Sequence, residues 1–290
     1  MTRILLTGKT GQVGYELERS LQGLGEIIAL DRSQMDLANL AQVRDVIRSV
    51  KPNLIINPAA YTAVDNAESE PELAMRINGE APGVMAEEAK KLGAAMIHYS
   101  TDYVFDGSKI TPYVETDPTC PINVYGATKL AGEQAIQSAG IPHLILRTSW
   151  VYGMRGKNFL LTMLRLAQER DELRIVADQY GAPTWCRTIA DTTAHIVAQA
   201  KGAQHAQDWW QERSGIYHLT AQGQTTWYGF TQAILENSTI AKKPALIPIK
   251  TEDYPLPARR PGYSVMSCDR LIEAFCDLPE WQSALRLCQV

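Results

Sequence analysis

Short apolar runs and longer amphipathic stretches alternate along the first 150 residues of the chain. The apolar runs predict strands, and the stretches between them, with apolar residues three or four apart, predict helices. The predicted strands cover residues 3–7, 27–30, 54–57, 94–100 and 143–148. The predicted helices cover residues 11–24, 37–50, 71–92 and 125–138. Pro82 predicts a bend in the third helix, because proline has no N–H group to donate.

Strands that alternate with helices of this length are typical of βαβ units and therefore of a parallel sheet. The strands are apolar throughout rather than alternating, which indicates that helices cover both faces of the sheet. After residue 150 the pattern loosens, and its shorter elements predict an α+β unit. Helices are expected over 158–170, 188–199 and 227–236, with strands over 173–176, 216–219 and 246–249. The fold class is α/β, a doubly wound Rossmann domain with a smaller second domain.

The two domains are expected to be interleaved along the chain. Residues 1–150, with roughly 184–203, form the dinucleotide-binding domain. Roughly 151–183 and 204–290 form the substrate-binding domain, including the proline-rich and mostly irregular stretch 251–263.

Composition narrows the classes of function. The 290 residues carry 28 basic and 32 acidic side chains, a net charge of −4 that favours neither a nucleic-acid nor a membrane partner. No apolar run approaches the roughly 20 residues of a membrane span, and the N-terminus does not resemble a signal peptide. The five cysteines form no CxxC motif and indicate free thiols in the cytoplasm. No metal-binding motif is present, so we expect no metal site.

A glycine-rich turn follows the first predicted strand, in the segment TGKTGQVG from Thr7 to Gly14. Gly8 allows the tight turn, Gly11 lets the backbone approach a pyrophosphate, and Gly14 lets the helix pack close to the sheet. The phosphates would then lie at the helix N-terminus, where N–H groups are free. A P-loop is excluded because Arg3 stands where that motif needs a glycine.

The second strand is followed by Asp31 and Arg32. An acidic residue about 20 residues after the glycines can accept hydrogen bonds from a ribose hydroxyl, whereas Arg32 could pair with a 2′-phosphate. The sequence therefore leaves NADH and NADPH both open.

Candidate catalytic residues follow the glycine motif at a distance. Tyr125 and Lys129 are four apart on a predicted helix and share one face. An ammonium group beside a phenol favours the phenolate and lowers the pKa of the tyrosine. Thr101 ends the fourth strand, at the edge where open α/β sheets bind ligands, and could hydrogen-bond a substrate carbonyl. Together with the glycines, this YxxxK pair points to the short-chain dehydrogenase/reductase superfamily.

Longer segments carry a more specific resemblance, to the dTDP-4-dehydrorhamnose reductases. They are, in order, TGKTGQVG, NPAAYTAVDNAESEPELA, STDYVFDG, NVYGATKLAGE, RTSWVYG, NFLLTML, DQYGAPT and RPGYS. The match runs from Thr7 to about Ser264. YxxxK belongs to the whole superfamily, whereas STDYVFDG with RTSWVYG and DQYGAPT is far more specific.

The resemblance implies an enzyme that transfers a hydride from NADPH or NADH to C4 of dTDP-4-dehydro-6-deoxy-L-mannose and forms dTDP-L-rhamnose. It implies Tyr125 as the acid, Lys129 as the residue that tunes it and holds the nicotinamide ribose, and Thr101 as the third catalytic member. The expected cofactor-binding residues are Gly8, Gly11, Gln12, Val13, Gly14, Asp31, Arg32, Asp36, Leu37, Ala60, Tyr61, Thr62, Tyr125 and Lys129. The expected substrate contacts are Thr101, Asp102, Tyr103, Trp150, Asn158 and Arg260, with Arg260 as a clamp on the diphosphate.

Two alternatives share the scaffold. A nucleotide-sugar 4,6-dehydratase or epimerase resembles this chain, but dehydratases carry an Asp-Glu pair after the catalytic threonine, where this chain has Asp102 and Tyr103. A non-catalytic regulatory subunit would bind the dinucleotide and a partner. Intact Thr101, Tyr125 and Lys129 disfavour that reading.

Arg187 is a departure from the relatives that form magnesium-bridged dimers, which carry a carboxylate at this position. A permanent positive charge disfavours a divalent cation, and Arg187 could pair with Glu16 instead. We therefore expect a monomer or a metal-independent dimer. The Trp209-Trp210 pair, among polar residues, is expected to be a local anchor rather than a binding platform.

Overall fold

A parallel six-stranded sheet forms the centre of the protein. The computed structural model describes residues 2–289. Neighbouring strands follow the order β10-β5-β4-β3-β1-β2, and every pair in this sheet is parallel. The strands are β1 (Arg3–Leu6), β2 (Glu26–Ala29), β3 (Leu54–Asn57), β4 (Ala95–Thr101), β5 (His143–Thr148) and β10 (Gly215–His218). The predicted fold class, a doubly wound α/β sheet, is confirmed.

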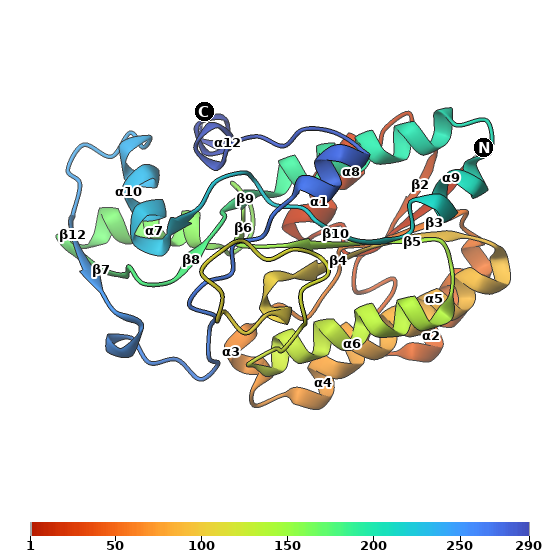
Figure 1. The fold of residues 1–290 in the computed structure, drawn as a ribbon, viewed down its shortest axis with the longest axis horizontal. Helices are drawn as coiled ribbons and strands as arrows, with labels where there is room; N and C mark the ends of the chain where they lie inside the picture. The colour runs from red at the N-terminus through yellow and green to blue at the C-terminus, as the bar shows by residue number, and fades with distance from the viewer. Residues whose placement is uncertain (1, 290) are drawn as a thin grey trace.

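Helices cover both faces of the sheet (Figure 1). One face carries α2 (Leu40–Val50), α4 (Pro71–Met75), α5 (Ala81–Leu92) and α6 (Val124–Ala139). The other carries α1 (Gln12–Ser20), α8 (Cys186–Gly202), α9 (Ala206–Glu212) and α11 (Asp269–Ala274). Successive strand residues point to opposite faces, so Ile4 and Leu6 enter one core while Leu5 enters the other. This explains why the strands are apolar throughout.

A separate hydrophobic core lies beyond the carboxyl edge of the sheet, at the left of Figure 1. It is built on the parallel pair β7 (Glu172–Val176) and β12 (Ala245–Ile249). Three helices pack there: α7 (Phe159–Glu169), α10 (Trp227–Glu236) and α12 (Trp281–Cys288). Two short strand pairs link this core to the sheet. They are β6 (Val151–Tyr152) with β9 (Thr184–Trp185), and β8 (Tyr180–Gly181) with β11 (Thr225–Thr226).

Strand β10 corrects the sequence-based division of the chain. Residues 204–290 were expected in the second domain, yet β10 pairs in parallel with β5 and completes the central sheet. A strand at this position covers the edge of β5, which would otherwise present unpaired N–H and C=O groups. The apolar pattern of β10, which is four residues long, predicts a strand but does not indicate which sheet the strand joins.

The helix expected over 71–92 is interrupted. It consists of α4, a π-helical turn η1 (Arg76–Glu80) and α5. Pro82 lies in the first turn of α5 and has no N–H for the carbonyl of Asn78, four residues earlier. That carbonyl instead faces Gly132 of α6, where an added Cβ would lie 2.2 Å from it. The π-helical turn begins at Arg76 and lies just before Pro82, where the sequence predicted a bend.

Other expectations concern isolated residues. Trp210 is buried and makes an edge-to-face contact with Trp209, which packs on Phe275, so the pair is a local anchor as predicted. All five cysteines are free thiols. None of the helices in the described part of the chain has the length and apolar character needed to cross a membrane.

Arg147 of β5 and Glu133 of α6 form a fully buried ion pair. The Nε and Nη2 atoms of Arg147 lie 2.9 and 2.7 Å from the two carboxylate oxygens of Glu133. Their side chains are 2% and 1% exposed. Such a bidentate pair fixes α6 over the sheet, and removing one partner leaves the other charge buried and uncompensated.

We expect Glu133→Gln to lower the free energy of unfolding by about 3–5 kcal/mol, the usual result of breaking a buried pair. Glu169→Gln is the matched control, because its partner Arg165 lies on the surface of α7 and exposed pairs contribute little. Urea denaturation of both variants checks the prediction. Equal stability of the two variants would contradict it.

Candidate active site

The turn after β1 is shaped for a close approach to a phosphate group. Gly8 has a φ of +60°, and a Cβ on Gly14 would lie 2.1 Å from the carbonyl oxygen of Gly8. Gly11 caps α1 without a side-chain hydrogen bond, and the first turn of the helix carries no acidic residue. The N–H groups of Gln12 and Val13 therefore lie at a helix end with an uncompensated positive dipole. The turn fits a dinucleotide pyrophosphate.

Asp31 and Arg32 lie beyond the carboxyl end of β2. Hydrogen bonds from Ser33 lower the pKa of Asp31, and Lys9 is 3.6 Å from its carboxylate. Arg32 is 77% exposed and lies 3.5 Å from Asp36. Asp31 is therefore an ionised acceptor suited to ribose hydroxyls, and the exposed Arg32 could reach a 2′-phosphate by turning away from Asp36.

Leu37 follows in the same segment, but its side chain is buried in the core below the sheet. Only its backbone could contact a cofactor. Val13 likewise packs partly against the other core.

The loop after β3 is held by Asn78 of η1. The Asn78 side chain accepts a hydrogen bond from the N–H of Tyr61 at 2.8 Å and donates to its carbonyl at 3.0 Å. The Tyr61 phenol donates to Glu70, which raises the pKa of Tyr61 to about 12. Ala60 is half-buried and Thr62 is exposed. The backbone of this loop is therefore fixed next to the glycine turn, since Gly8 lies against Ala59.

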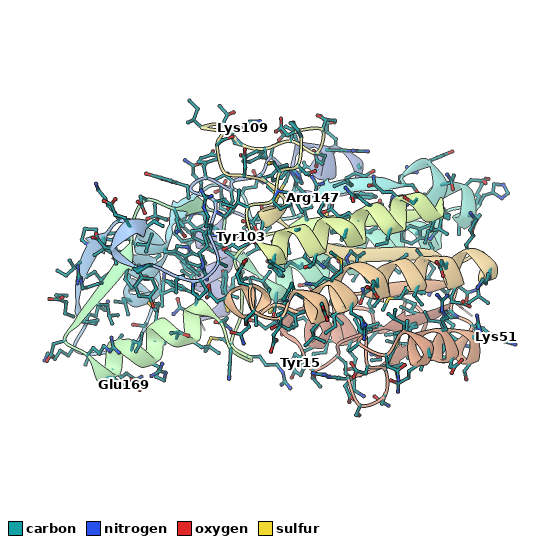
Figure 2. All side chains as sticks on the ribbon, turned by 90° about the horizontal axis from the view of Figure 1, so that it is seen from below. Tyr15, Lys51, Tyr103, Lys109, Arg147 and Glu169 are labelled. Carbon is teal, nitrogen blue, oxygen red and sulfur yellow. The ribbon has the colours of Figure 1, made fainter. Side chains whose placement is uncertain are left out.

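Thr101, Asp102 and Tyr125 meet where β4 ends. Asn123 caps α6 and places Tyr125 in its first turn. The Thr101 hydroxyl donates to Asp102 Oδ1 at 3.0 Å and accepts the N–H of Tyr103 at 3.2 Å. The Tyr103 and Tyr125 rings make an edge-to-face contact, with centroids 5.9 Å apart. Figure 2 shows Tyr103 beside the N-terminal end of α6.

Burial dominates the ionisation of these groups. It raises the pKa of Asp102 to about 7, and one of its oxygens, Oδ2, has no hydrogen-bond partner among the described residues. Burial, and then the charge of Asp102, raises the pKa of Tyr125 to about 12. At neutral pH the Tyr125 phenol is therefore protonated and able to donate.

Lys129 lies one turn along α6 from Tyr125, with its side chain 2% exposed. Its Nζ donates to the Tyr99 carbonyl at 2.6 Å and lies 3.2 Å from His98 Nε2. Burial lowers the pKa of Lys129 to about 8. An ammonium has three N–H groups, so one remains for a ligand.

The structure does not support the expectation that Lys129 lowers the pKa of Tyr125. The two residues share a face of α6 as predicted, but Lys129 Nζ is directed to Tyr99 and His98. Burial of the phenol and the charge of Asp102 then decide its pKa, which rises.

Trp150 is held in a strained conformation. Its φ is +46°, one of two positive values at non-glycine residues in the described range. Its ring stacks on Trp227 with centroids 3.5 Å apart and an interplanar angle of 7°. A Cβ on Gly181 would lie 2.4 Å from the Trp150 ring, and Gln179 accepts a hydrogen bond from Trp227 Nε1. Trp227 thus covers one face of the half-buried Trp150 ring, and Gly181 lies against the Nε1 side of that ring. Strain of this kind is common at ligand sites.

Two polar contacts join residues near the sheet, Gln12 and Asp65, to residues from the second half of the chain, Asn158 and Arg260. Asn158 caps α7, and its Nδ2 donates to Gln12 Oε1 at 2.8 Å. Arg260 forms a bidentate pair with Asp65 of α3 (Val64–Ala67), at 3.0 and 2.8 Å. Asn158 and Arg260, both expected to contact substrate, therefore have protein partners here, and Arg260 could bind a diphosphate only by sharing its guanidinium with Asp65.

The expected contact between Arg187 and Glu16 is not formed. Arg187 lies 3.6 Å from Asp191, one turn further along α8. Residues four apart on a helix meet without tertiary help, which explains this choice of partner. In the described range no group of three or more His, Cys, Asp or Glu residues could hold a metal ion.

Sequence reasoning missed several residues of this region. Asp65 and Trp227 partner expected site residues, and Asn57 and His98 lead to Lys129. Asn57 and Asp65 both lie within the segment NPAAYTAVDNAESEPELA, which carried the family resemblance and was a usable signal. For His98 and Trp227 the sequence offered only a histidine within a predicted strand and an aromatic residue at the start of a helix.

Comparisons with known proteins agree with this geometry. The family model described as the RmlD substrate binding domain matches residues 1–289. The chain is 50% identical to a dTDP-4-dehydrorhamnose reductase of Burkholderia thailandensis, over 99% of this chain and 97% of that protein. It is 46% identical to a dTDP-4-dehydrorhamnose reductase of Escherichia coli K12, over 98% of this chain and 95% of that protein.

Solved structures give the same picture. The fold is similar to dTDP-4-dehydrorhamnose reductase from Bacillus anthracis in complex with NADP, with a TM-score of 0.90, 34% identity and 99% of both chains covered. A UDP-glucose 4-epimerase from Thermus thermophilus shares the fold at a TM-score of 0.80 and 20% identity, over 99% of this chain and 97% of that one.

We expect Arg32→Ala to weaken NADPH binding about tenfold, since a charge-assisted contact to the 2′-phosphate is lost at an exposed position. NADH lacks that phosphate, so its affinity should stay unchanged and serves as the internal control. Fluorescence titration of both cofactors measures this. Equal losses for NADPH and NADH would show that Arg32 does not reach the 2′ position.

Proposed function

The chain belongs to the RmlD substrate binding domain family, and we infer from this that it is an NAD(P)H-dependent dTDP-4-dehydrorhamnose reductase. It reduces C4 of dTDP-4-dehydro-6-deoxy-L-mannose and forms dTDP-L-rhamnose. The observation that carries this conclusion is near-full-length similarity to reductases of this name, combined with intact Thr101, Tyr125 and Lys129 at the carboxyl edge of the sheet.

The glycine turn and the residues after β2 would hold the dinucleotide. The free N–H groups at the start of α1 fit its pyrophosphate, and the Asp31 carboxylate fits the adenosine ribose. The remaining N–H of Lys129 would bind the nicotinamide ribose. When bound, the reduced nicotinamide supplies the hydride that the carbonyl carbon of the sugar accepts.

Tyr125 would donate the proton that the developing alkoxide at O4 requires. Its phenol is protonated at neutral pH because burial raises its pKa to about 12. The Thr101 hydroxyl, which now donates to Asp102, can turn to the same oxygen and polarise the carbonyl. Asp102, with a pKa of about 7 and one unpartnered oxygen, is placed to accept from a sugar hydroxyl.

The rest of the substrate would lie toward the second core. Trp150 offers a rigid aromatic surface, fixed by Trp227 and Gly181. Arg260 lies near Tyr103, since its positive charge opposes the rise that burial causes in the pKa of the Tyr103 phenol. Arg260 would contact the diphosphate while keeping Asp65 as a partner. In this proposal, residues 1–150 with 184–203 and strand β10 bind the dinucleotide, and the residues of the second core bind the nucleotide sugar. The free thiols support a cytoplasmic location.

A dehydratase reaction is disfavoured by Tyr103. Elimination of water needs a second carboxylate as a base, and Tyr103 occupies that position with its pKa raised by burial. Tightly bound oxidised cofactor in the purified protein would favour the dehydratase or epimerase. A regulatory subunit is distinguished by turnover. Cofactor oxidation assayed with dTDP-4-dehydro-6-deoxy-L-mannose, and with other keto-sugar nucleotides, decides among the three.

We expect Tyr125→Phe to lower kcat by roughly 10²–10⁴-fold, the usual effect of removing an acid–base group. The ring remains, so NADPH binding should be unchanged. Tyr228→Phe in α10 removes a phenol outside the site and is the matched control. Steady-state assays and cofactor titration measure both effects. Near-normal turnover of Tyr125→Phe would eliminate Tyr125 as the acid.

We propose that the protein is a monomer or a metal-independent dimer, because Arg187 places a permanent positive charge beside Asp191 on α8. Activity and molar mass should therefore survive treatment with EDTA. Light scattering coupled to gel filtration, with parallel assays, checks this. Loss of both dimer and activity, restored by magnesium, would refute the proposal.

A further inference from the structure

A row of buried polar side chains crosses the carboxyl edge of the sheet and ends at Lys129. Thr7 Oγ1 is 2.6 Å from Asn57 Oδ1, and Asn57 Nδ2 is 3.1 Å from His98 Nδ1. His98 Nε2 is 3.2 Å from Lys129 Nζ. Asn57 and His98 are direct neighbours in the register of β3 and β4, and all four side chains are buried. Asn57 and His98 have no other role in the proposed reaction.

The hydrogen atoms in this row must be arranged consistently. The 2.6 Å separation suits an O–H donor on Thr7 better than an N–H donor on Asn57. Asn57 then directs its N–H group at His98 Nδ1, which accepts. A neutral imidazole carries one proton, and this proton lies on Nε2, facing Lys129. That arrangement suits an uncharged lysine amine, which can accept it.

A charged Lys129 requires the opposite arrangement. An ammonium has donors only, so His98 Nε2 must accept and the imidazole proton must lie on Nδ1. Asn57 then turns its amide to present Oδ1 to His98 and Nδ2 to Thr7. Amide orientations and histidine tautomers share their heavy-atom positions. The row can therefore change between the two arrangements without moving the backbone.

Burial and a neighbouring charge keep His98 neutral. Burial, and then the charge of Lys129, hold the pKa of His98 well below its ordinary value. Burial lowers the pKa of Lys129, and the negative charge of Glu133 on α6 acts in the opposite direction. Arg147 of β5 pairs with the Glu133 carboxylate. From β3 the facing group is the uncharged Asn57.

The 3-10 turn η2 (Asp102–Val104) packs on the N-terminal end of α6. Of its titratable groups, Asp102 and Tyr103, the charge of Asp102 raises the pKa of Tyr103 and of Tyr125, and neither group shifts the pKa of Lys129. Among the described residues, the hydrogen-bond partners of Lys129 Nζ are the Tyr99 carbonyl, which can only accept, and His98, which can accept or donate.

We propose that His98, held by Asn57, is a positioning residue that gives Lys129 a hydrogen-bond partner in both of its charge states by exchanging its tautomer. The inference rests on the proposed function, in which Lys129 holds the nicotinamide ribose and acts beside Tyr125. Its consequence is that Lys129 Nζ keeps one direction whether it carries two or three protons.

A direct test is ¹⁵N NMR of the histidine side chains in the substrate-free protein, with His98 assigned from the spectrum of His98→Gln. We expect His98 to stay neutral between about pH 6 and about pH 10, and to pass from the Nδ1–H to the Nε2–H tautomer as Lys129 loses its proton. A single tautomer over this range, or protonation of both nitrogens within it, would overturn the inference.

Kinetics supply the second test, in the alkaline limb of the pH profile of kcat. His98→Leu removes a partner of the ammonium, so this limb should move to lower pH by about one unit. His98→Gln, whose amide can accept or donate, should restore it. Asn57→Asp can only accept from His98, favours the ammonium, and should move the limb to higher pH.

His195→Leu, at an exposed position of α8, is the control and should leave the profile unchanged. Opposite shifts for His98→Leu and Asn57→Asp support the inference. Unshifted limbs, or shifts in the same direction, would overturn it even if kcat falls, because a merely structural role changes kcat alone. If wild-type protein does not reduce the keto sugar, the proposed function fails, and the NMR titration still decides the role of His98.

Discussion

Burial of the Lys129 amine is the constraint on which the arrangement of the site depends. A lysine that is 2% exposed must exchange its water for protein partners, and here these are the Tyr99 carbonyl and His98 Nε2. Both partners belong to β4, so the end of α6 must lie close against that strand. Glycine at position 132 lets the same helix approach η1, since a Cβ there would lie 2.2 Å from the carbonyl oxygen of Asn78. The packing of α6 on the sheet also brings Glu133 into contact with Arg147. Each of these two buried side chains then neutralises the charge of the other.

Exclusion of water from this region also separates the roles of its ionisable groups. It raises the pKa of Tyr125 and Asp102 and lowers that of Lys129. A phenol that stays protonated suits a reductase, which must deliver a proton to the oxygen of the reduced carbonyl. Tyr103 fits the same logic, because a buried phenol with a raised pKa offers no base for elimination. The local environment therefore favours reduction over dehydration on a scaffold that supports both.

The second core is attached to the sheet by polar contacts beside the expected ligand sites. Asn158 meets Gln12 of the glycine turn, and Arg260 meets Asp65 beyond β3. Asn158 could turn from Gln12 to a ligand, and Arg260 could share its guanidinium between Asp65 and a ligand. The stacked Trp150 and Trp227 rings, in contrast, cannot move without loss of packing. The site thus combines a rigid aromatic surface with two adjustable connections.

The sequence by itself determined the features that depend on local patterns. Apolar strands between amphipathic helices specified the parallel sheet, glycine spacing specified the turn after β1, and the four-residue spacing placed Tyr125 and Lys129 on one face. Only the tertiary structure decided where the long side chains are directed. Lys129 turns to His98, 31 residues away, and Arg260 to Asp65, 195 residues away. It also decided that β10 joins the central sheet. Such partners are selected by burial and by the register of distant strands, and neither is encoded in the residues adjacent along the chain.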